Sequence, residues 1–270
     1  MAKALTVIGL GNMGGSMVKG LLKSPLKDQH PLKVFDLHPD IKDQFAEMET
    51  CQGVEDLSLL GKDGECLIFC VKPHDLKSLA ETLRGKIDPD CLVLSILAGV
   101  RIETIQEELD FQGGVVRAMP NIAATIGEAA TAMCCNANCS KDQKELAERV
   151  FQAVGEAYWT KESLMDTVTG LSGSGPAYIY MVIEALTDGG VKMGLPRSLS
   201  QNLATQTVLG AAALVKHTGQ HPAILKDQVT TPAGTTISAL HELEERGLRS
   251  MFVSAVEKAT DRSRFLGESR

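Results

Sequence analysis

The sequence predicts an α/β fold: a doubly wound, mostly parallel sheet domain followed by an all-helical domain. In the first half of the chain, short continuous apolar runs alternate with helical patterns, which is typical of a parallel sheet covered on both faces. In the second half, two long segments have apolar residues on nearly every face of a helix. Of the 270 residues, 44% are hydrophobic and 23% are charged, so the chain can bury a core without disulfides.

Six apolar runs are the expected strands of the first domain. Most of them are separated by segments in which apolar residues recur at helical spacing. The expected strands cover residues 4–9, 32–35, 66–71, 91–96, 115–119 and 129–135, and the expected helices cover residues 13–22, 40–48, 75–83 and 141–154.

The character of the chain changes near residues 161–166, where we place the domain boundary. This gives a dinucleotide-binding domain over residues 1–163 and a helical dimerisation domain over residues 164–270. Helices expected at 177–193 and 200–217 are apolar all round and must be buried on all sides. Because so short a helical region cannot easily bury both, we expect them to interleave with a partner chain. Burial within one subunit is the alternative.

The charge of the chain argues against a nucleic-acid partner. The net charge is −7 and the pI is about 5.4, without a long run of either sign, so a phosphate backbone is repelled on average. The apolar run at residues 4–10 is too short to span a membrane and leads into a helical pattern. We therefore expect a cytoplasmic protein with neither a signal peptide nor a membrane partner.

The seven cysteines lack the spacing of a disulfide framework, which indicates a reducing compartment. Cys134, Cys135 and Cys139 are clustered, but the cluster has neither a paired CxxC motif nor a nearby histidine. We expect small buried side chains on a strand rather than a metal site.

A dinucleotide-binding fingerprint follows the first expected strand and opens the first expected helix. Gly9, Gly11 and Gly14 match GxGxxG, with Asn12 and Met13 inside the motif. Glycines at these places allow a tight turn, close approach of a pyrophosphate and close packing of helix on strand. The alternative is a glycine-rich turn that binds nothing.

Asp36 ends the second expected strand, about 20 residues beyond the fingerprint, as does the acidic residue that binds the ribose 2′-hydroxyl of NAD. Such a carboxylate repels the 2′-phosphate of NADP, so Asp36 favours NADH. The alternative is an aspartate that makes a local turn before Pro39.

Two further strand ends carry candidate cofactor contacts, because ligands of open α/β sheets sit at the carboxyl ends of the strands. Val71, Lys72 and Pro73 follow the third expected strand, and Ala98 lies in a small-residue segment after the fourth. Small residues let a flat ring approach the backbone. Lys72 is equally compatible with a solvated turn.

Two segments crowd hydroxyl residues and glycines ahead of a helical pattern, at residues 169–178 and 229–237. Free amides at a helix N-terminus bind small anions such as a carboxylate. In the second segment we expect substrate contacts from Thr231, Gly234, Thr235 and Thr236. The alternative is that these threonines merely cap a helix.

Together these motifs closely resemble those of the pyrroline-5-carboxylate reductase family, over nearly the whole chain. The resemblance includes Val71-Lys72-Pro73 and the segment 117–121, in which Pro120 and Asn121 fix a turn beside the cofactor ring. The alternative is a structural turn, which would need the same residues. The resemblance implies a Rossmann-type domain, a helical dimerisation domain and NAD(P)H-dependent reduction of 1-pyrroline-5-carboxylate to L-proline, the last step of proline biosynthesis. It gives Thr236 the catalytic contact with the ring nitrogen, and it implies a homodimer that can assemble further.

Two other functions fit a two-domain cofactor-binding chain. A β-hydroxyacid or imine dehydrogenase would need a catalytic lysine in the second domain, and Lys192 is the nearest candidate. A scaffold protein that has kept the fold would bind NADH without turnover and would be indifferent to Thr236→Ala.

Overall fold

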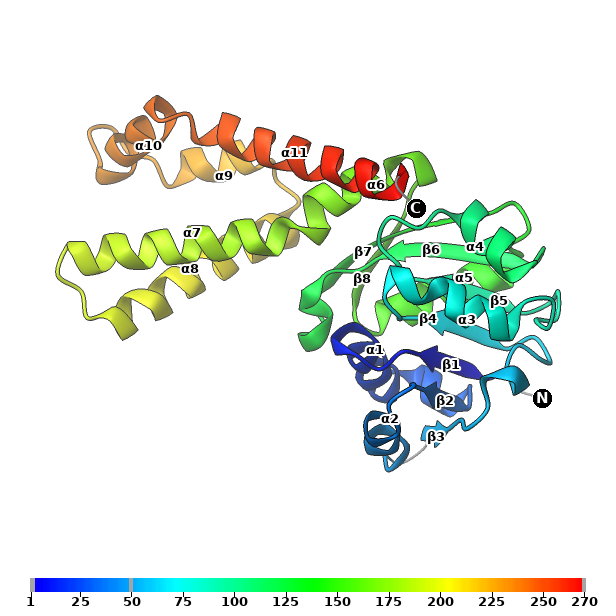
Figure 1. Ribbon diagram of the computed structural model, residues 1–270. Coiled ribbons are helices and arrows are strands. Elements are labelled where there is room, and N and C mark those ends of the chain that lie inside the picture. The colour runs from blue at the N-terminus through cyan, green and yellow to red at the C-terminus, as the bar shows by residue number, and fades with distance from the viewer. Residues whose placement is uncertain (1–2, 49–50, 269–270) are drawn as a thin grey trace. The chain divides into compact units, whose positions relative to one another are not determined.

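Figure 1 shows the computed structural model, which describes residues 3–48 and 51–268. Its contacts group the chain into two compact units. The sheet unit comprises Met1–Ser174 and Lys258–Arg270, and the helical unit comprises Gly175–Glu257. The domains 1–163 and 164–270 remain a prediction, because compact units within one chain do not establish which parts fold alone.

The sheet unit contains an eight-stranded sheet with the order β3-β2-β1-β4-β5-β6-β7-β8. Neighbouring strands are parallel except β6 and β7, so β7 and β8 run against the other six. The winding direction reverses between β1 and β4, and the predicted doubly wound, mostly parallel sheet is confirmed. The strands are β1 (Leu5–Ile8), β2 (Leu32–Phe35), β3 (Cys51–Gly53), β4 (Cys66–Phe69), β5 (Leu92–Ser95), β6 (Gly114–Met119), β7 (Ala129–Cys135) and β8 (Gly155–Trp159).

Two hydrophobic clusters cover the two faces of the sheet. In β4, Ile68 belongs to one cluster with residues of α1, α2 and α5, and Leu67 belongs to the other with residues of α3 and α4. Because successive side chains of a strand point to opposite faces, such strands are apolar without interruption. The helices are α1 (Asn12–Lys23), α2 (Pro39–Ala46), α3 (Leu76–Leu83), α4 (Ile102–Leu109) and α5 (Lys141–Gln152).

The helical unit is built from the helices predicted for the second half and from others that the sequence analysis did not identify. Helices α7 and α8 pack against each other. The unit holds α7 (Gly175–Lys192), α8 (Arg197–Thr218), α9 (Pro222–Gln228), α10 (Thr235–Glu245) and the first part of α11 (Leu248–Glu268).

Within one chain, α7 and α8 leave most of their apolar surface exposed. Helix α7 buries Thr187 alone, and α8 buries Ser200 and Ala204. Met181 is 69% exposed and Leu209 is 60% exposed. Contacts within the helical unit therefore leave both helices largely uncovered, which supports the expectation that another chain covers them.

Candidate active site

A cavity of about 570 Å³ lies at the carboxyl ends of the parallel strands in the sheet unit. Its walls come from the segments that follow β1, β2, β4, β5 and β6, as expected for a ligand site in an open α/β sheet. Nine of the eleven predicted cofactor residues line it, and these are Gly9, Gly11, Asn12, Met13, Asp36, Val71, Lys72, Pro73 and Ala98.

The glycine-rich turn has the geometry that the fingerprint requires. Gly9 has a φ of +91°, which side chains rarely adopt, and a Cβ on Gly14 would lie 1.8 Å from the Gly9 carbonyl oxygen. Gly14 therefore lets α1 pack against the turn, although it does not line the cavity. The N-cap of α1 is Gly11, and its first turn holds no acidic residue. The first amides of α1 are thus open to an anion.

Asp36 fixes this turn from the end of β2. Its Oδ2 accepts from the Leu10 amide at 2.6 Å, and its Oδ1 accepts from the His38 amide at 2.9 Å. The second bond is the local turn that the alternative interpretation expects, and the first is an additional link to the glycine-rich turn. Asp36 lines the cavity beside Leu37 and His38.

The segments after β4 and β5 complete the wall. Val71, Lys72 and Pro73 line it after β4, and Ile96, Leu97 and Ala98 line it after β5. Burial raises the pKa of the Cys70 thiol, at the end of β4, to about 12. That side chain is therefore a neutral wall element at pH 7 rather than a thiolate nucleophile.

Asn121 does not line the cavity, although its neighbours Pro120 and Ile122 do. Its Oδ1 accepts from the Ala123 amide at 3.2 Å, and its Nδ2 donates to the Ser172 carbonyl oxygen at 3.1 Å. The side chain thus links the turn after β6 to the hydroxyl-rich segment around Ser172. A contact between Asn121 and a cofactor remains a prediction.

The predicted substrate residues lie in the helical unit, at the start of α10. Gly234 is the N-cap, so the cap residue has no side chain to accept from the first amides of the helix. Thr231 and Gly234 form a tight turn, because the Gly234 amide donates to the Thr231 carbonyl oxygen at 3.0 Å. Ala233 between them has a φ of +58°, a left-handed conformation that is costly for a side chain.

The positions of the threonines at the start of α10 show whether they cap this helix. Thr235 and Thr236 are the first two helical residues of α10, and Thr231 precedes its N-cap, so none of them occupies the cap position. Thr235 is exposed and Thr236 is half-buried. None of these threonines therefore serves as the N-cap of α10.

The first hydroxyl-rich segment has a different structure. Residues Thr169–Gly173 form a π-helical turn, η6, which leads into α7. Ser172 donates its hydroxyl to the Val168 carbonyl oxygen at 3.2 Å, and a Cβ on Gly173 would lie 2.9 Å from Met119. The close approach of Gly173 to Met119 therefore serves packing of this segment against β6.

The cysteine cluster is built into the sheet. Cys134 is buried in β7, and Cys139 is buried beyond it with its thiol 3.5 Å from the Val115 carbonyl oxygen. Among the described residues, no group of three or more histidine, cysteine and acidic side chains could hold a metal ion. None of the helices within residues 3–48 and 51–268 is long and apolar enough to cross a membrane.

Sequence reasoning missed part of the cavity wall. His38 and Ile41 line it from the start of α2, and Ser78 and Thr82 line it from α3. Ser78 and Thr82 lie four positions apart on α3, the helix that follows Val71-Lys72-Pro73. Because side chains at i and i+4 share a helix face, this spacing was the signal that could have identified them.

The parallel sheet, the glycine-rich turn and the cavity at the strand ends define a dinucleotide-dependent oxidoreductase. A family model described as "NADP oxidoreductase coenzyme F420-dependent" matches residues 4–99, and one described as "Pyrroline-5-carboxylate reductase dimerisation" matches residues 162–266. The chain belongs to the pyrroline-5-carboxylate reductase family.

Named relatives and solved structures match along nearly the full length. The pyrroline-5-carboxylate reductase of Methanosarcina acetivorans is 43% identical, covering 97% of both chains, and that of Arabidopsis thaliana is 40% identical, covering 97% of this chain and 95% of its own. The structure of the Coxiella burnetii enzyme aligns with a TM-score of 0.90 at 33% identity, covering 98% of this chain and 99% of its own. The Plasmodium falciparum enzyme, solved with NADP bound, aligns with a TM-score of 0.84 at 30% identity, covering 98% of each chain.

Proposed function

We propose that this chain uses NAD(P)H to reduce 1-pyrroline-5-carboxylate to L-proline, the last step of proline biosynthesis. The observation that carries the proposal is a dinucleotide-type cavity in a chain of the pyrroline-5-carboxylate reductase family. A hydroxyacid dehydrogenase is less well supported, because Lys192 is exposed at the last position of α7.

The residues around the cavity fit a nicotinamide dinucleotide. The open amides of α1 suit the pyrophosphate, and Gly9 and Gly14 let the backbone come close to it. Asp36 suits the hydroxyls of the adenosine ribose, and the small side chain of Ala98 suits a flat ring. When bound, the dinucleotide supplies the hydride.

The start of α10 supplies the groups that a small cyclic imine with one carboxylate needs. The open amides beyond Gly234 and the hydroxyls of Thr231 and Thr235 orient the carboxylate. Thr236 hydrogen-bonds the ring nitrogen, next to the carbon that receives the hydride. Because an iminium form is already accessible in water, Thr236 orients the imine and no strong protein acid is required.

The experiment that tests this function is turnover of 1-pyrroline-5-carboxylate by wild type and Thr236→Ala, followed by NAD(P)H absorbance and proline formation. We expect kcat/KM to fall about 10- to 100-fold, because loss of one hydrogen bond to the substrate costs about 1–3 kcal/mol. The melting temperature should stay unchanged, because Thr236 is not the cap of α10. Equal turnover by both proteins would contradict the role of Thr236, and an inactive wild type that binds NADH would favour a scaffold.

We propose that NADH is the preferred cofactor, on the basis of Asp36. A carboxylate next to the ribose repels a 2′-phosphate, so kcat/KM should be higher with NADH than with NADPH. Asp36→Ser should shift the ratio toward NADPH by about tenfold or more, equivalent to about 1.4 kcal/mol. Asp40→Ser is the matched control, because Asp40 is close in sequence but does not line the cavity. If the ratio of kcat/KM for NADH to kcat/KM for NADPH is the same in both variants, Asp36 does not determine the cofactor preference.

We also propose a homodimer formed through the helical unit, which can assemble further. The dimerisation match over residues 162–266 and the exposed apolar side chains of α7 and α8 support the dimer. A cytoplasmic location stays a prediction, supported by the seven free cysteines.

A further inference from the structure

The segment between β5 and α4 carries part of the cavity wall, because Ile96, Leu97 and Ala98 line the cavity. Its start is fixed to the sheet, since the Ile96 amide donates to the Phe69 carbonyl oxygen of β4 at 3.1 Å. Leu97 and Val100 are buried in the core, and the Leu97 amide donates to the Ser95 hydroxyl at 3.3 Å. The placement of its far end depends in addition on what holds the start of α4.

That far end is held by a carboxylate distant in sequence. Helix α4 begins at Ile102, and its N-cap, Arg101, makes no side-chain cap bond. The Ile102 amide instead donates to Oε1 of Glu162 at 2.8 Å. Glu162 opens the short helical turn η5 (Glu162–Leu164) that follows β8. An acidic side chain at a helix N-terminus satisfies an open amide and complements the helix dipole.

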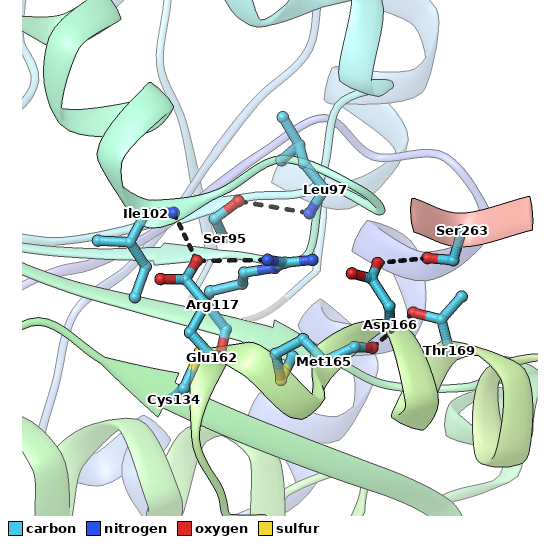
Figure 2. Close-up of polar contacts among 10 residues, drawn as sticks. All are labelled: Ser95, Leu97, Ile102, Arg117, Cys134, Glu162, Met165, Asp166, Thr169 and Ser263. Carbon is cyan, nitrogen blue, oxygen red and sulfur yellow. Dashed lines mark hydrogen bonds and ion pairs between the residues drawn. The ribbon is translucent and has the colours of Figure 1, made fainter. Parts of the chain in front are cut away.

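Oε1 of Glu162 also forms an ion pair with the buried side chain of Arg117. The Nη1 of Arg117 lies 3.3 Å from Oε1 of Glu162, and Arg117 is 5% exposed on β6. The backbone of Arg117 on β6 is paired in register with Ser95 at the end of β5, the strand from which the segment departs. Figure 2 shows Glu162 between Arg117 and the Ile102 amide.

We infer that Glu162 is a positioning residue for the cavity segment 96–101, and through it for the nicotinamide end of the cofactor. Arg117 fixes the carboxylate to the sheet, and the carboxylate fixes the start of α4. This inference rests on the proposed placement of the dinucleotide in the cavity. A segment that shifts by even about 1 Å misplaces reacting groups and lowers the rate of the chemical step strongly.

The chain offers a matched control on the opposite edge of the same sheet. Glu65, just before β4, is 3% exposed and accepts from the Gly61 amide at 2.7 Å and from Lys33 at 3.2 Å. It thus joins a backbone amide and a cation through one carboxylate, as Glu162 does. Glu65 also accepts from the Thr6 hydroxyl and is buried, whereas the Glu162 side chain is 35% exposed. Neither Glu65 nor Glu162 lines the cavity. Glu65→Ala and Glu162→Ala therefore each remove a carboxylate that joins an amide to a cation, at two places in one sheet.

The experiment compares wild type, Glu65→Ala and Glu162→Ala by two readouts. Hydrogen exchange of the peptide covering residues 96–102 should be at least tenfold faster in Glu162→Ala alone, because alanine offers the Ile102 amide no acceptor. In the same variant kcat should fall about tenfold while the KM for NADH changes less than twofold, and the isotope effect on kcat with C4-deuterated NADH should rise. In Glu65→Ala, both the exchange of this peptide and kcat should match the wild type.

A double variant keeps the inference testable if Glu162→Ala does not fold. In Arg117→Met/Glu162→Leu no uncompensated buried charge remains, so the fold should be retained. The Ile102 amide still lacks its acceptor, so exchange of residues 96–102 should stay fast and kcat low.

The outcomes separate this inference from the proposed function. Unchanged exchange in both Glu162 variants would overturn the positioning role, whether or not the wild type reduces 1-pyrroline-5-carboxylate. Faster exchange with unchanged kcat would overturn it as well. An inactive wild type would contradict the proposed function, while the exchange comparison would still decide whether Glu162 holds the segment.

Discussion

The two units of the chain bury their apolar residues very differently. In the sheet unit, strands β1, β4 and β5 bury every residue. In the helical unit, α7 buries one residue of 18, and neither α9 nor α10 buries any. The sheet unit therefore buries its apolar core within one chain, whereas most apolar side chains of the helical unit stay exposed in a single chain. The difference assigns assembly to the helical unit, where the dimerisation match lies.

The largest expected effect contrasts one leucine from each unit. Leu67 in β4 is fully buried, and Leu67→Ala should lower the free energy of unfolding by about 2–5 kcal/mol at any protein concentration. Leu209 on α8 is 60% exposed in the single chain, so the loss in Leu209→Ala should appear only as protein concentration rises and the dimer forms. Urea denaturation at two protein concentrations measures both. The contrast between the two units would be wrong if both variants lost the same free energy of unfolding at every protein concentration.

A charge placed on the exposed apolar surface tests assembly directly. Leu209→Glu should weaken association of two copies about 100-fold, roughly 2–3 kcal/mol, because a charge would be buried without a partner. Leu59→Glu is the control, since Leu59 is 71% exposed in the sheet unit and should leave association unchanged. Sedimentation velocity across a concentration series distinguishes them, and equal dissociation constants would refute the assignment.

The smallest expected effect concerns helix starts. Helix α5 begins with a capping box in which the Ser140 hydroxyl accepts from the Gln143 amide at 3.2 Å, whereas α1 and α10 begin at glycines. Ser140→Ala should cost about 1 kcal/mol of stability with no change in KM for either substrate. Thermal melting and steady-state kinetics on one preparation check this. A changed KM would mean that the capped N-terminus of α5 also contributes to binding of substrate or cofactor.

Much of the sheet unit could be predicted from the sequence because buried parallel strands are continuous apolar runs. The strand expected at residues 32–35 has the observed bounds of β2. Strands β3 and β8 were missed because they lie outermost in the sheet, and neither has a fully buried residue that would make it a continuous apolar run. Helix α4 was missed although Ile102, Ile105 and Leu109 carry the helical spacing that predicts it.

The candidate site was predictable where it depends on local motifs. The glycine-rich turn and the strand ends line the cavity as expected. Partnerships between distant residues were not predictable, because neither spacing nor composition pairs Glu162 with Arg117 across 45 residues. A hint was present, since a cation inside the apolar strand β6 requires a buried partner. Similarly, no local pattern fixes the left-handed Ala233 ahead of α10.

The sheet unit takes its final piece from the far end of the chain, Lys258–Arg270, after the whole helical unit. Ser263 in this piece donates its hydroxyl to Asp166 at 2.7 Å (Figure 2). During synthesis from the N-terminus, α7 and α8 emerge before this contact can form. A nascent chain therefore exposes its assembly surface while the reductase fold is still unfinished, so a chain stalled before residue 258 is expected to need chaperone protection.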